Sequence, residues 1–520
     1  MTVLLHHLLD RAASVDPGKE AVVDGDRRFT YRDFAGASRT CAAVLREHGM
    51  EPGDRVGVYL EKSFEETYAI FGASMAGGAI VPINPLLRPR QVAHILGDCR
   101  VRFLITTARR QEELGVVTDD TESLERILLI DRFEGSSDDR LVSHAFARPP
   151  TAPSPVPRRG EDLAAILYTS GSSGLPKGAM LSHRNLLAGS RIVCQYLGIR
   201  DSERILSVLP FSFDYGLNQL LTAVERGATT ILLSFRFGNE IVRAIHDEEV
   251  TAVAGVPGLW TVLSDAAPAF RKQKLGSLRY LTNSGGSMPL ETLARIRAAQ
   301  PQADFVLMYG FTEAFRSTYL PPAELDARPT SIGKAIPETE VFLVNDEGNA
   351  CRPGEEGILV HDGPTVFLGY WGREEDTRAV LRPHPFRPRE EGRLVCYSGD
   401  RVTMDEDGYF YFVGRDDAMI KSSGYRISPT EVESVLLEAA TVSEAAVIGI
   451  PDPVLGQSIK AFVAVRDGAS VRTDDLLAFC AERMPRYMVP SVVEVVDGLP
   501  RNVNGKIDYP LLRRRESLPR

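Results

Sequence analysis

Short β-branched runs alternate with helical patterns through about the first four fifths of the chain, and this alternation constrains the fold most strongly. The segments Phe64–Ala76 and Leu290–Ala299 carry apolar residues at helical spacing between such runs. Parallel strands need helices to cover both faces of their sheet, so the alternation predicts parallel sheets packed between helices. The runs expected to form strands are Arg55–Leu60, Phe103–Thr106, Ala165–Thr169, Ile205–Leu209, Thr230–Leu233 and Ala252–Val256.

The sequence pattern changes near Pro337. From there to Gly414, short runs separated by turn residues predict an antiparallel, barrel-like subdomain. Helical and strand patterns mix again after Gly414. We therefore expect an α/β protein with a large N-terminal domain, residues 1–413, and a small α+β C-terminal domain, residues 414–520. Within the large domain, the proline-rich stretch Arg148–Arg159 is expected to connect two parallel-sheet subdomains.

Composition limits the classes of function. The 520 residues carry a formal net charge of −10 with a pI of about 5.6, which argues against a nucleic-acid-binding protein. The six cysteines form no CxxC pair, as expected of reduced, buried thiols in a cytoplasmic protein. The N-terminus lacks a basic region and a cleavage site, so we expect a helix there and not a signal peptide. No segment is long and apolar enough to predict a membrane span.

A loop rich in glycine and hydroxyl groups follows the predicted strand at Ala165 and ends in Lys177. Backbone N–H groups of such a loop can surround phosphate, and the lysine adds a positive charge for the β- or γ-phosphate. Pro176 and Gly178 break the Walker A pattern on both sides of the lysine, and a flexible surface turn is the alternative interpretation. The residues expected to contact phosphate are Thr169, Ser170, Gly171, Ser172, Ser173, Gly174 and Lys177.

Five segments of the chain follow the order of motifs in the adenylate-forming superfamily, which contains acyl-CoA synthetases, luciferases and nonribosomal peptide synthetase adenylation domains. The first, Tyr168–Gly178, resembles the superfamily's phosphate loop, with Ser172 and Ser173 where threonines are usual. The third segment, Tyr397–Asp400, is one residue shorter than the corresponding motif of the superfamily. The other four segments are Tyr309-Gly-Phe-Thr-Glu313, Tyr397-Ser-Gly-Asp400, Gly414-Arg415-Asp416-Asp417 and Asn504-Gly-Lys506. Five motifs in order over essentially the whole chain make this resemblance specific.

The resemblance implies that ATP activates a carboxylic acid as an acyl-adenylate, with release of pyrophosphate, before a phosphopantetheine thiol accepts the acyl group. Positioning and electrostatics carry such an in-line displacement, and no protein nucleophile is needed. In the ATP site, Glu313 would hold Mg²⁺ beside the catalytic Thr312. Asp400 would accept hydrogen bonds from the ribose hydroxyls, and Arg415 would pair with ribose or phosphate oxygens. Tyr309 and Gly310 belong to the same site.

The resemblance also gives roles to the C-terminal domain. Lys506 follows an Asn504-Gly505 turn and would bridge the substrate carboxylate and the α-phosphate, where it stabilises the charge that develops during attack. Asp417 lies at the expected junction of the domains and would be the hinge for their rotation between two half-reactions. One orientation would present Lys506 for adenylation. The other would present the loop Lys421–Arg426 for attack by a thiol.

The acid is expected to bind near the pair Phe213-Asp214. This pair resembles the Phe-Asp of amino-acid adenylation domains, whose aspartate binds the substrate ammonium, and a lone buried carboxylate is costly without such a partner. Ser284 and Arg316 resemble pocket positions in free-standing enzymes that load β-amino acids onto carrier proteins, and Arg316 could bind a second carboxylate. Alternatively, Asp214 caps a helix starting near Gly216, and Arg316 is a structural ion-pair partner. The residues expected in this pocket are Phe213, Asp214, Ser284, Gly285, Gly286, Phe311 and Arg316.

Three functional hypotheses follow. The leading hypothesis is that the chain activates an amino acid, for example a β-amino acid or an amino dicarboxylic acid, for a separate carrier protein. The second is an AMP-forming acyl-CoA ligase that uses free coenzyme A, because the segment Phe311–Pro322 resembles exosortase-associated acyl-CoA ligases. The third is a regulatory nucleotide-binding protein without catalysis, which retention of Glu313, Asp400 and Lys506 disfavours. The expected partners are a small acid and a thiol acceptor, with no nucleic acid or membrane, for a monomer or homodimer.

Overall fold

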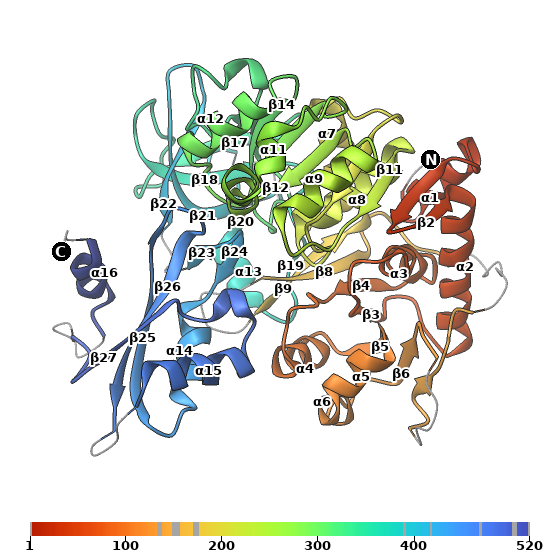
Figure 1. Cartoon of the computed structure of the whole chain (residues 1–520), viewed down its shortest axis with the longest axis horizontal. Coiled ribbons are helices and arrows are strands. Elements are labelled where there is room, and N and C mark those ends of the chain that lie inside the picture. The colour runs from red at the N-terminus through yellow and green to blue at the C-terminus, as the bar shows by residue number, and fades with distance from the viewer. Residues whose placement is uncertain are drawn as a thin grey trace.

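The computed structural model describes residues 3–132, 138–147, 156–169, 176–387, 392–415, 419–466, 471–501 and 507–517 (Figure 1). Two large sheets and a smaller antiparallel sheet make up most of the chain, and a fourth sheet forms the C-terminal domain. In Figure 1 the C-terminal sheet lies at the left, and the first helices of the chain lie at the right.

The first large sheet is covered by helices on both faces. Its strands are β3 (Arg55–Val58), β4 (Ala79–Pro82), β5 (Val101–Thr106), β6 (Arg126–Leu129), β7 (Leu141–Val142), β8 (Leu163–Thr169), β9 (Lys177–Ser182) and β19 (Gly369–Tyr370), and its helices are α2 (Tyr31–Glu47), α3 (Phe64–Met75), α4 (Pro89–Asp98), α5 (Ala108–Leu114) and α6 (Val116–Asp119). The strand order is β19-β9-β8-β4-β3-β5-β6-β7, parallel from β8 to β7. Successive residues of a strand face opposite sides, so Ile80 packs in the core of α2 and α3 while Val81 packs in the core of α4.

The second large sheet is parallel over its central strands and antiparallel at both edges. Its strands are β1 (Glu20–Asp24), β2 (Arg27–Thr30), β10 (Arg204–Ser207), β11 (Thr229–Leu232), β12 (Ala252–Gly255), β13 (Tyr280–Asn283), β14 (Asp304–Tyr309), β15 (Thr318–Leu320) and β16 (Lys334–Ala335), in the order β16-β15-β14-β13-β12-β10-β11-β1-β2. The helices of this part are α1 (His7–Val15), α7 (His183–Tyr196), α8 (Asp214–Arg226), α9 (Gly238–Asp247), α10 (Pro257–Thr261), α11 (Pro268–Lys272) and α12 (Leu290–Ala299).

The proline-rich stretch Arg148–Arg159 does not separate the two sheets as expected. Strand β8 follows the stretch yet pairs in parallel with β4 of the first sheet, at Ile80 and Ala165. Strands β1 and β2 precede it yet complete the second sheet. Pairing between strands distant in the chain brings β8 into the first sheet and β1, with its antiparallel neighbour β2, into the second, and local composition does not reveal such pairing. Residues 148–155 of this stretch lie outside the described residues.

Two antiparallel sheets complete the molecule. The first contains β17 (Glu340–Val344), β18 (Gly357–Asp362), β20 (Leu381–Pro383), β21 (Leu394–Met404) and β22 (Phe410–Arg415), with α13 (Glu374–Val380) beside it. The C-terminal sheet is antiparallel except where β27 runs parallel to β26, and it contains β23 (Ile420–Ser422), β24 (Tyr425–Ile427), β25 (Val442–Asp452), β26 (Gly456–Val465) and β27 (Val492–Val496), with α14 (Pro429–Leu437), α15 (Thr473–Arg483) and α16 (Tyr509–Ser517). The predicted α/β class with a small α+β C-terminal domain is confirmed.

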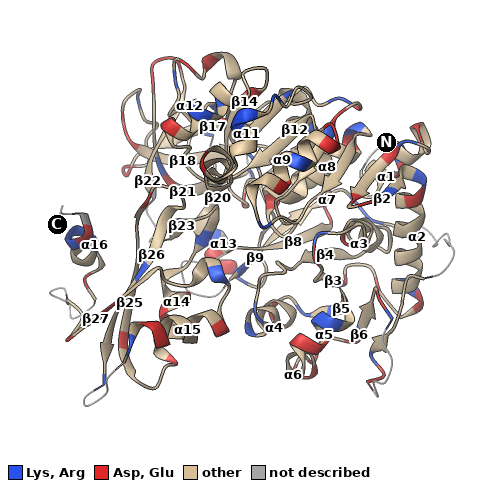
Figure 2. Ribbon diagram, viewed as in Figure 1, with Lys and Arg blue, Asp and Glu red and all other residues tan. Residues whose placement is uncertain are grey.

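Charge is distributed in keeping with the acidic composition. Figure 2 shows basic and acidic residues interspersed along most helices and strands of the view. A search of the described residues finds no helix with the length and apolar character that crossing a bilayer requires. The predicted N-terminal helix is confirmed as α1, whose buried face consists of Leu8, Leu9 and Ala12.

Candidate functional site

A pocket of about 150 Å³ lies between the large sheets and the C-terminal domain. The loops after the carboxyl ends of β8, β10, β13 and β14 contribute to its wall, which is where parallel α/β sheets usually bind ligands. The predicted site residues that line this pocket are Thr169, Phe213, Asp214, Ser284, Gly285, Gly310, Phe311, Thr312, Arg316 and Asp400. Residues far apart in the sequence therefore converge on one pocket.

Tyr309 and Asp400 join two sheets at the pocket wall. The Tyr309 hydroxyl, at the end of β14, donates to Asp400 Oδ2 over 2.5 Å. Asp400 lies on β21 and is only 1% exposed, and its backbone N–H donates to Ser398 Oγ over 3.0 Å. These bonds hold the Asp400 carboxylate at a defined position on the pocket wall.

Glu313 lies just behind the pocket lining. Its carboxylate accepts a hydrogen bond from the Tyr370 hydroxyl, and the Arg426 guanidinium of the C-terminal domain lies 3.7 Å from Oε1. Glu313 Oε2 is buried and has no hydrogen-bond partner among the described residues. Mg²⁺ prefers carboxylate oxygens, so a buried carboxylate with an unused oxygen fits this ion. Arg426 would have to leave Oε1 before both oxygens could face a cation.

Lys177 is the one predicted phosphate-loop side chain besides Thr169 that falls within the described residues. It starts β9, is buried, and its Nζ donates to Asp376 Oδ1 of α13 over 2.6 Å. The Tyr370 ring lies 5.6 Å from the same Nζ. The other loop residues predicted to contact phosphate, Ser170, Gly171, Ser172, Ser173 and Gly174, lie outside the described residues.

Asp214 and Arg316 form a buried ion pair at the acid end of the pocket. Arg316 Nη1 lies 3.3 Å from Asp214 Oδ2, and both side chains are at most 5% exposed. Asp214 is the first residue of α8, two residues before the expected helix start. Burial raises the pKa of Asp214, and the Arg316 guanidinium opposes that rise. The structural ion-pair alternative is therefore realised, while Arg316 Nε and Nη2 stay buried without hydrogen-bond partners in the part of the chain that the structure describes.

The loop after β14 requires an unusual backbone. A Cβ atom on Gly310 would lie 3.0 Å from Arg316 Cα, so the loop closes tightly on itself. Phe315 adopts a φ of 60°, which is uncommon for a side chain of its size and is typical of functional turns. Gly285 also needs positive φ, at 84°, whereas Gly286 packs on Pro257 outside the pocket lining.

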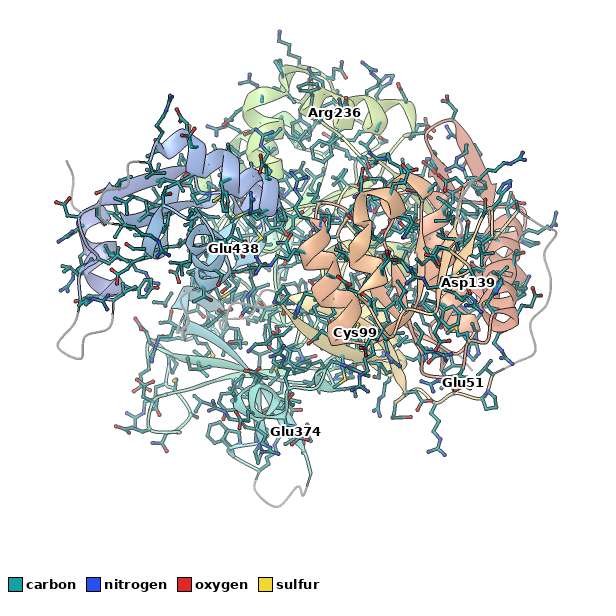
Figure 3. The ribbon with its side chains drawn as sticks, turned by 90° about the horizontal axis from the view of Figure 1, so that it is seen from below. Glu51, Cys99, Asp139, Arg236, Glu374 and Glu438 are labelled. Carbon is teal, nitrogen blue, oxygen red and sulfur yellow. The ribbon has the colours of Figure 1, made fainter. Side chains whose placement is uncertain are left out.

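The C-terminal domain closes the pocket with the loop Lys421–Arg426. Lys421, Gly424, Tyr425 and Arg426 line the same pocket as Asp214 and Arg316. Figure 3 shows this domain, marked by Glu438, against the helices near Cys99, where Arg90 and Glu438 form an ion pair.

The orientation predicted to present Lys506 for adenylation involves residues outside the described ones. The residues flanking the Lys506 segment, Arg501 and Ile507, pair with each other, and Arg501 forms an ion pair with Glu444 of β25. Lys506 and Asp417 themselves lie outside the described residues. The Arg415 backbone pairs with Asp400 at the end of β22, but its side chain is also outside the described set.

His361 supports the loop that carries Thr312, Glu313 and Arg316. It is fully buried on β18, with Nδ1 3.0 Å from Ser317 Oγ and Nε2 3.0 Å from Thr365 Oγ1. Burial lowers the pKa of His361 to about 3, so the ring is neutral at pH 7. His361 was not predicted, because an isolated histidine in a strand does not indicate which distant residues it contacts.

We expect acid to destabilise the protein through its buried histidines. Burial lowers the pKa of His183 to about 4 as well as that of His361 to about 3. Both stay neutral when folded but protonate near pH 6.5 when unfolded, so stability is lost as pH falls from about 6.5 toward 4. Each should contribute roughly 2 kcal/mol of loss between pH 7 and pH 5. Urea unfolding at both pH values measures this, and His361→Gln should remove that residue's share, roughly 2 kcal/mol, with exposed His246→Gln as the control.

Two further contacts at the site were not predicted. Tyr370 connects Glu313 to the β19 strand, and Asp376 holds Lys177. Asp376 lies in the acidic first turn of α13, where carboxylates are common because they interact favourably with the helix dipole. Its sequence environment therefore gave no reason to place it beside the phosphate loop.

Comparison with known proteins agrees with this geometry. Residues 9–371 match the family described as AMP-binding enzyme, and residues 431–506 match the AMP-binding enzyme C-terminal domain. A feruloyl-CoA synthase from an Amycolatopsis species is 35% identical over 97% of both chains, and a long-chain-fatty-acid–CoA ligase from Bacillus subtilis is 29% identical over 98% of this chain and 93% of that one. The amide bond synthetase McbA from Marinactinospora thermotolerans shares the fold, with a TM-score of 0.88 at 24% identity over 98% of this chain and 99% of that one.

Family matches and site geometry thus lead to one conclusion. The chain has both domains of the family in order, and its pocket gathers residues predicted for the nucleotide and acid sites from positions that are distant in the sequence. The chain belongs to the AMP-binding enzyme family and is an AMP-forming ligase that uses ATP to adenylate a carboxylic acid.

Proposed function

We propose that this ligase activates a short acid bearing a second hydrogen-bond-accepting group and transfers the acyl group to free coenzyme A. The Asp214–Arg316 ion pair carries the proposal. A buried carboxylate without a partner would demand a cation from the substrate, whereas Arg316 already supplies one. The pocket therefore does not require an amine on the acid.

Arg316 also supports the second polar group. Its Nε and Nη2 are buried beside the pocket without hydrogen-bond partners, and an unsatisfied buried donor is costly. A carboxylate or carbonyl oxygen on the substrate would satisfy both donors, which a guanidinium presents in a planar fork.

The room behind the ion pair supports a short acid. The next cavity has a volume of about 30 Å³ and is lined by Tyr215, Asn218, Thr282 and Met308 among others. That volume admits about one water molecule and not an alkyl chain. The names of the feruloyl-CoA synthase and the long-chain-fatty-acid–CoA ligase therefore support the type of reaction but not the identity of the acid that this chain activates.

The acceptor side supports coenzyme A. A cleft of about 940 Å³ adjoins the pocket and shares Leu87, Tyr425 and Tyr487 with it. Exposed Arg88 and Arg486 lie on its rim, where guanidinium groups suit the phosphates of a nucleotide-bearing thiol. Both relatives compared above are named as enzymes that form CoA esters.

The roles of the remaining residues follow from their positions. Asp400 would bind the ribose, Thr169 and Lys177 with the rest of the loop would bind the phosphates, and Glu313 would bind Mg²⁺. When bound, the ion would neutralise phosphate charge. Lys506 would stabilise the charge that develops as the carboxylate attacks, after rotation about a hinge at Asp417.

Activation of an amino acid for a separate carrier protein is the second candidate. Asp214 and Arg316 line the same pocket and share a single 3.3 Å contact. An amino dicarboxylic acid could place its ammonium on Asp214 and its second carboxylate on Arg316, so that all four charges stay paired.

A matched panel of four-carbon acids tests the proposal. Pyrophosphate exchange and CoA-ester formation would be measured with butyrate, succinate, 4-aminobutyrate and aspartate. Succinate should exceed butyrate by about tenfold or more, the value of one charge-assisted hydrogen bond, and aspartate should not exceed succinate. Arg316→Gln combined with Asp214→Asn removes both charges together and should abolish this preference while the fold is retained.

The competing outcomes are distinct. Aspartate turnover above that of succinate, lost in Asp214→Asn, would replace this proposal with the amino-acid candidate. Exchange activity without CoA-ester formation would refute free coenzyme A as the acceptor. Rates that rise steadily with chain length would refute a short acid.

A further inference from the structure

We propose that Asp376 competes with ATP for Lys177 and so sets how tightly the enzyme binds ATP and pyrophosphate. This competition rests on the proposed role of Lys177 as a phosphate ligand, involves the nucleotide half of the site and does not depend on which acid or acceptor is used. It assigns a role to α13, an element outside the predicted motifs.

Lys177 and Asp376 are in direct contact. Lys177 Nζ donates to Asp376 Oδ1 over 2.6 Å, and the lysine side chain is only 9% exposed. Lys177 is the last charged residue of the phosphate loop and the first residue of β9. Lys177 is poorly solvated although the Asp376 side chain is 36% exposed, so this charge-assisted hydrogen bond neutralises the lysine in part.

Asp376 is also held in place. Strand β19 pairs with β9 at Gly369 and Tyr370, directly before α13. The Tyr370 backbone N–H donates to Thr377 Oγ1 over 2.9 Å, which ties the helix to the strand. Figure 3 marks the first residue of the helix, Glu374, which is largely exposed, whereas Asp376 turns inward to Lys177.

Asp376 and a bound phosphate would compete for the ammonium group of Lys177. The ammonium group of Lys177 cannot give its full charge to Asp376 and to a phosphate at once. A carboxylate beside bound phosphates also repels them, because like charges in a partly buried site destabilise each other. Binding of ATP or pyrophosphate must therefore loosen the Lys177–Asp376 contact, and release of pyrophosphate restores it. Asp376 thereby weakens the binding of ATP but favours the release of pyrophosphate.

The test measures binding in the absence of any acid, so that no turnover occurs. Dissociation constants of Asp376→Asn for Mg·ATP, pyrophosphate and AMP would be compared with those of the unaltered enzyme by calorimetry. We expect ATP and pyrophosphate to bind about fivefold more tightly, the upper range for one ion pair, while AMP, which lacks the β- and γ-phosphates, changes by less than about twofold. Asp376→Glu should restore affinities close to the original ones.

Two comparisons keep the result interpretable. Glu374→Gln removes an exposed carboxylate of the same helix, which pairs with Arg378, and should leave all three constants unchanged. Thermal unfolding of each variant reports whether the fold is retained. Weaker ATP binding in Asp376→Asn would mean that Asp376 helps to hold the nucleotide or its metal ion, and unchanged binding would mean that the pair is only structural. Either result would overturn the proposal without bearing on the acid or the acceptor.

Discussion

Replacing Lys506 with alanine is expected to lower acid-dependent ATP–pyrophosphate exchange by about 100-fold or more, while thioester formation from supplied acyl-adenylate stays within about twofold. The lysine would stabilise charge that develops only during attack on the α-phosphate, so its loss should act on adenylation alone. Exchange assays and single-turnover thioester assays measure the two steps separately.

The structure explains why the two steps should separate. The pocket is lined by residues of the loop Lys421–Arg426, whereas Arg501, which precedes the segment carrying Lys506, forms an ion pair with Glu444 of β25 in the C-terminal sheet. In this orientation the C-terminal domain presents the thiol-side loop. Arg501→Ala is the control, because it removes a cation from the same segment and should leave exchange within about twofold. Equal losses in both assays for Lys506→Ala would contradict the assigned role.

The converse effect is expected for Gly424→Ala, which should impair thioester formation while adenylation is retained. Ser423 and Gly424 are the central residues of the β23–β24 hairpin, with φ values of 52° and 84°. A Cβ atom on Gly424 would lie 2.7 Å from Val256 Cγ1, just before α10 of the large domain. The hairpin could then not dock, and overpacking of about 1–3 kcal/mol corresponds to a loss of about 5- to 150-fold.

Two further variants distinguish a docking defect from a general loss of stability. Gly408→Ala replaces a glycine with φ of 81° that has no neighbouring atom within 4 Å of the added Cβ, and should affect neither step. Val256→Ala removes the clashing methyl groups and should partly restore thioester formation in the Gly424→Ala background. An equal loss of adenylation in Gly424→Ala, or no rescue by Val256→Ala, would show that the hairpin does not act through this contact.

The nucleotide side of the site could be predicted to a large extent from sequence. Its residues follow strands within short motifs, and local order alone places Tyr309, Gly310 and Thr312 at the end of β14. Asp400 was predicted as a ribose ligand, and its fixation by Tyr309 could not be foreseen because the two belong to different sheets. Asp376, Tyr370 and His361 were missed for the same reason, since each acts through partners distant in the chain.

The sequence by itself determined the α/β class through its local periodicity, and the superfamily through a resemblance carried by five short motifs. It also named part of the set of residues that line the pocket. Only the tertiary structure decided that Asp214 is paired with Arg316, that Lys177 is held by Asp376 and that the C-terminal domain presents Lys421–Arg426 to the pocket. These are long-range electrostatic and packing contacts. They depend on how separate strands and domains are placed relative to one another, and no local pattern encodes that placement.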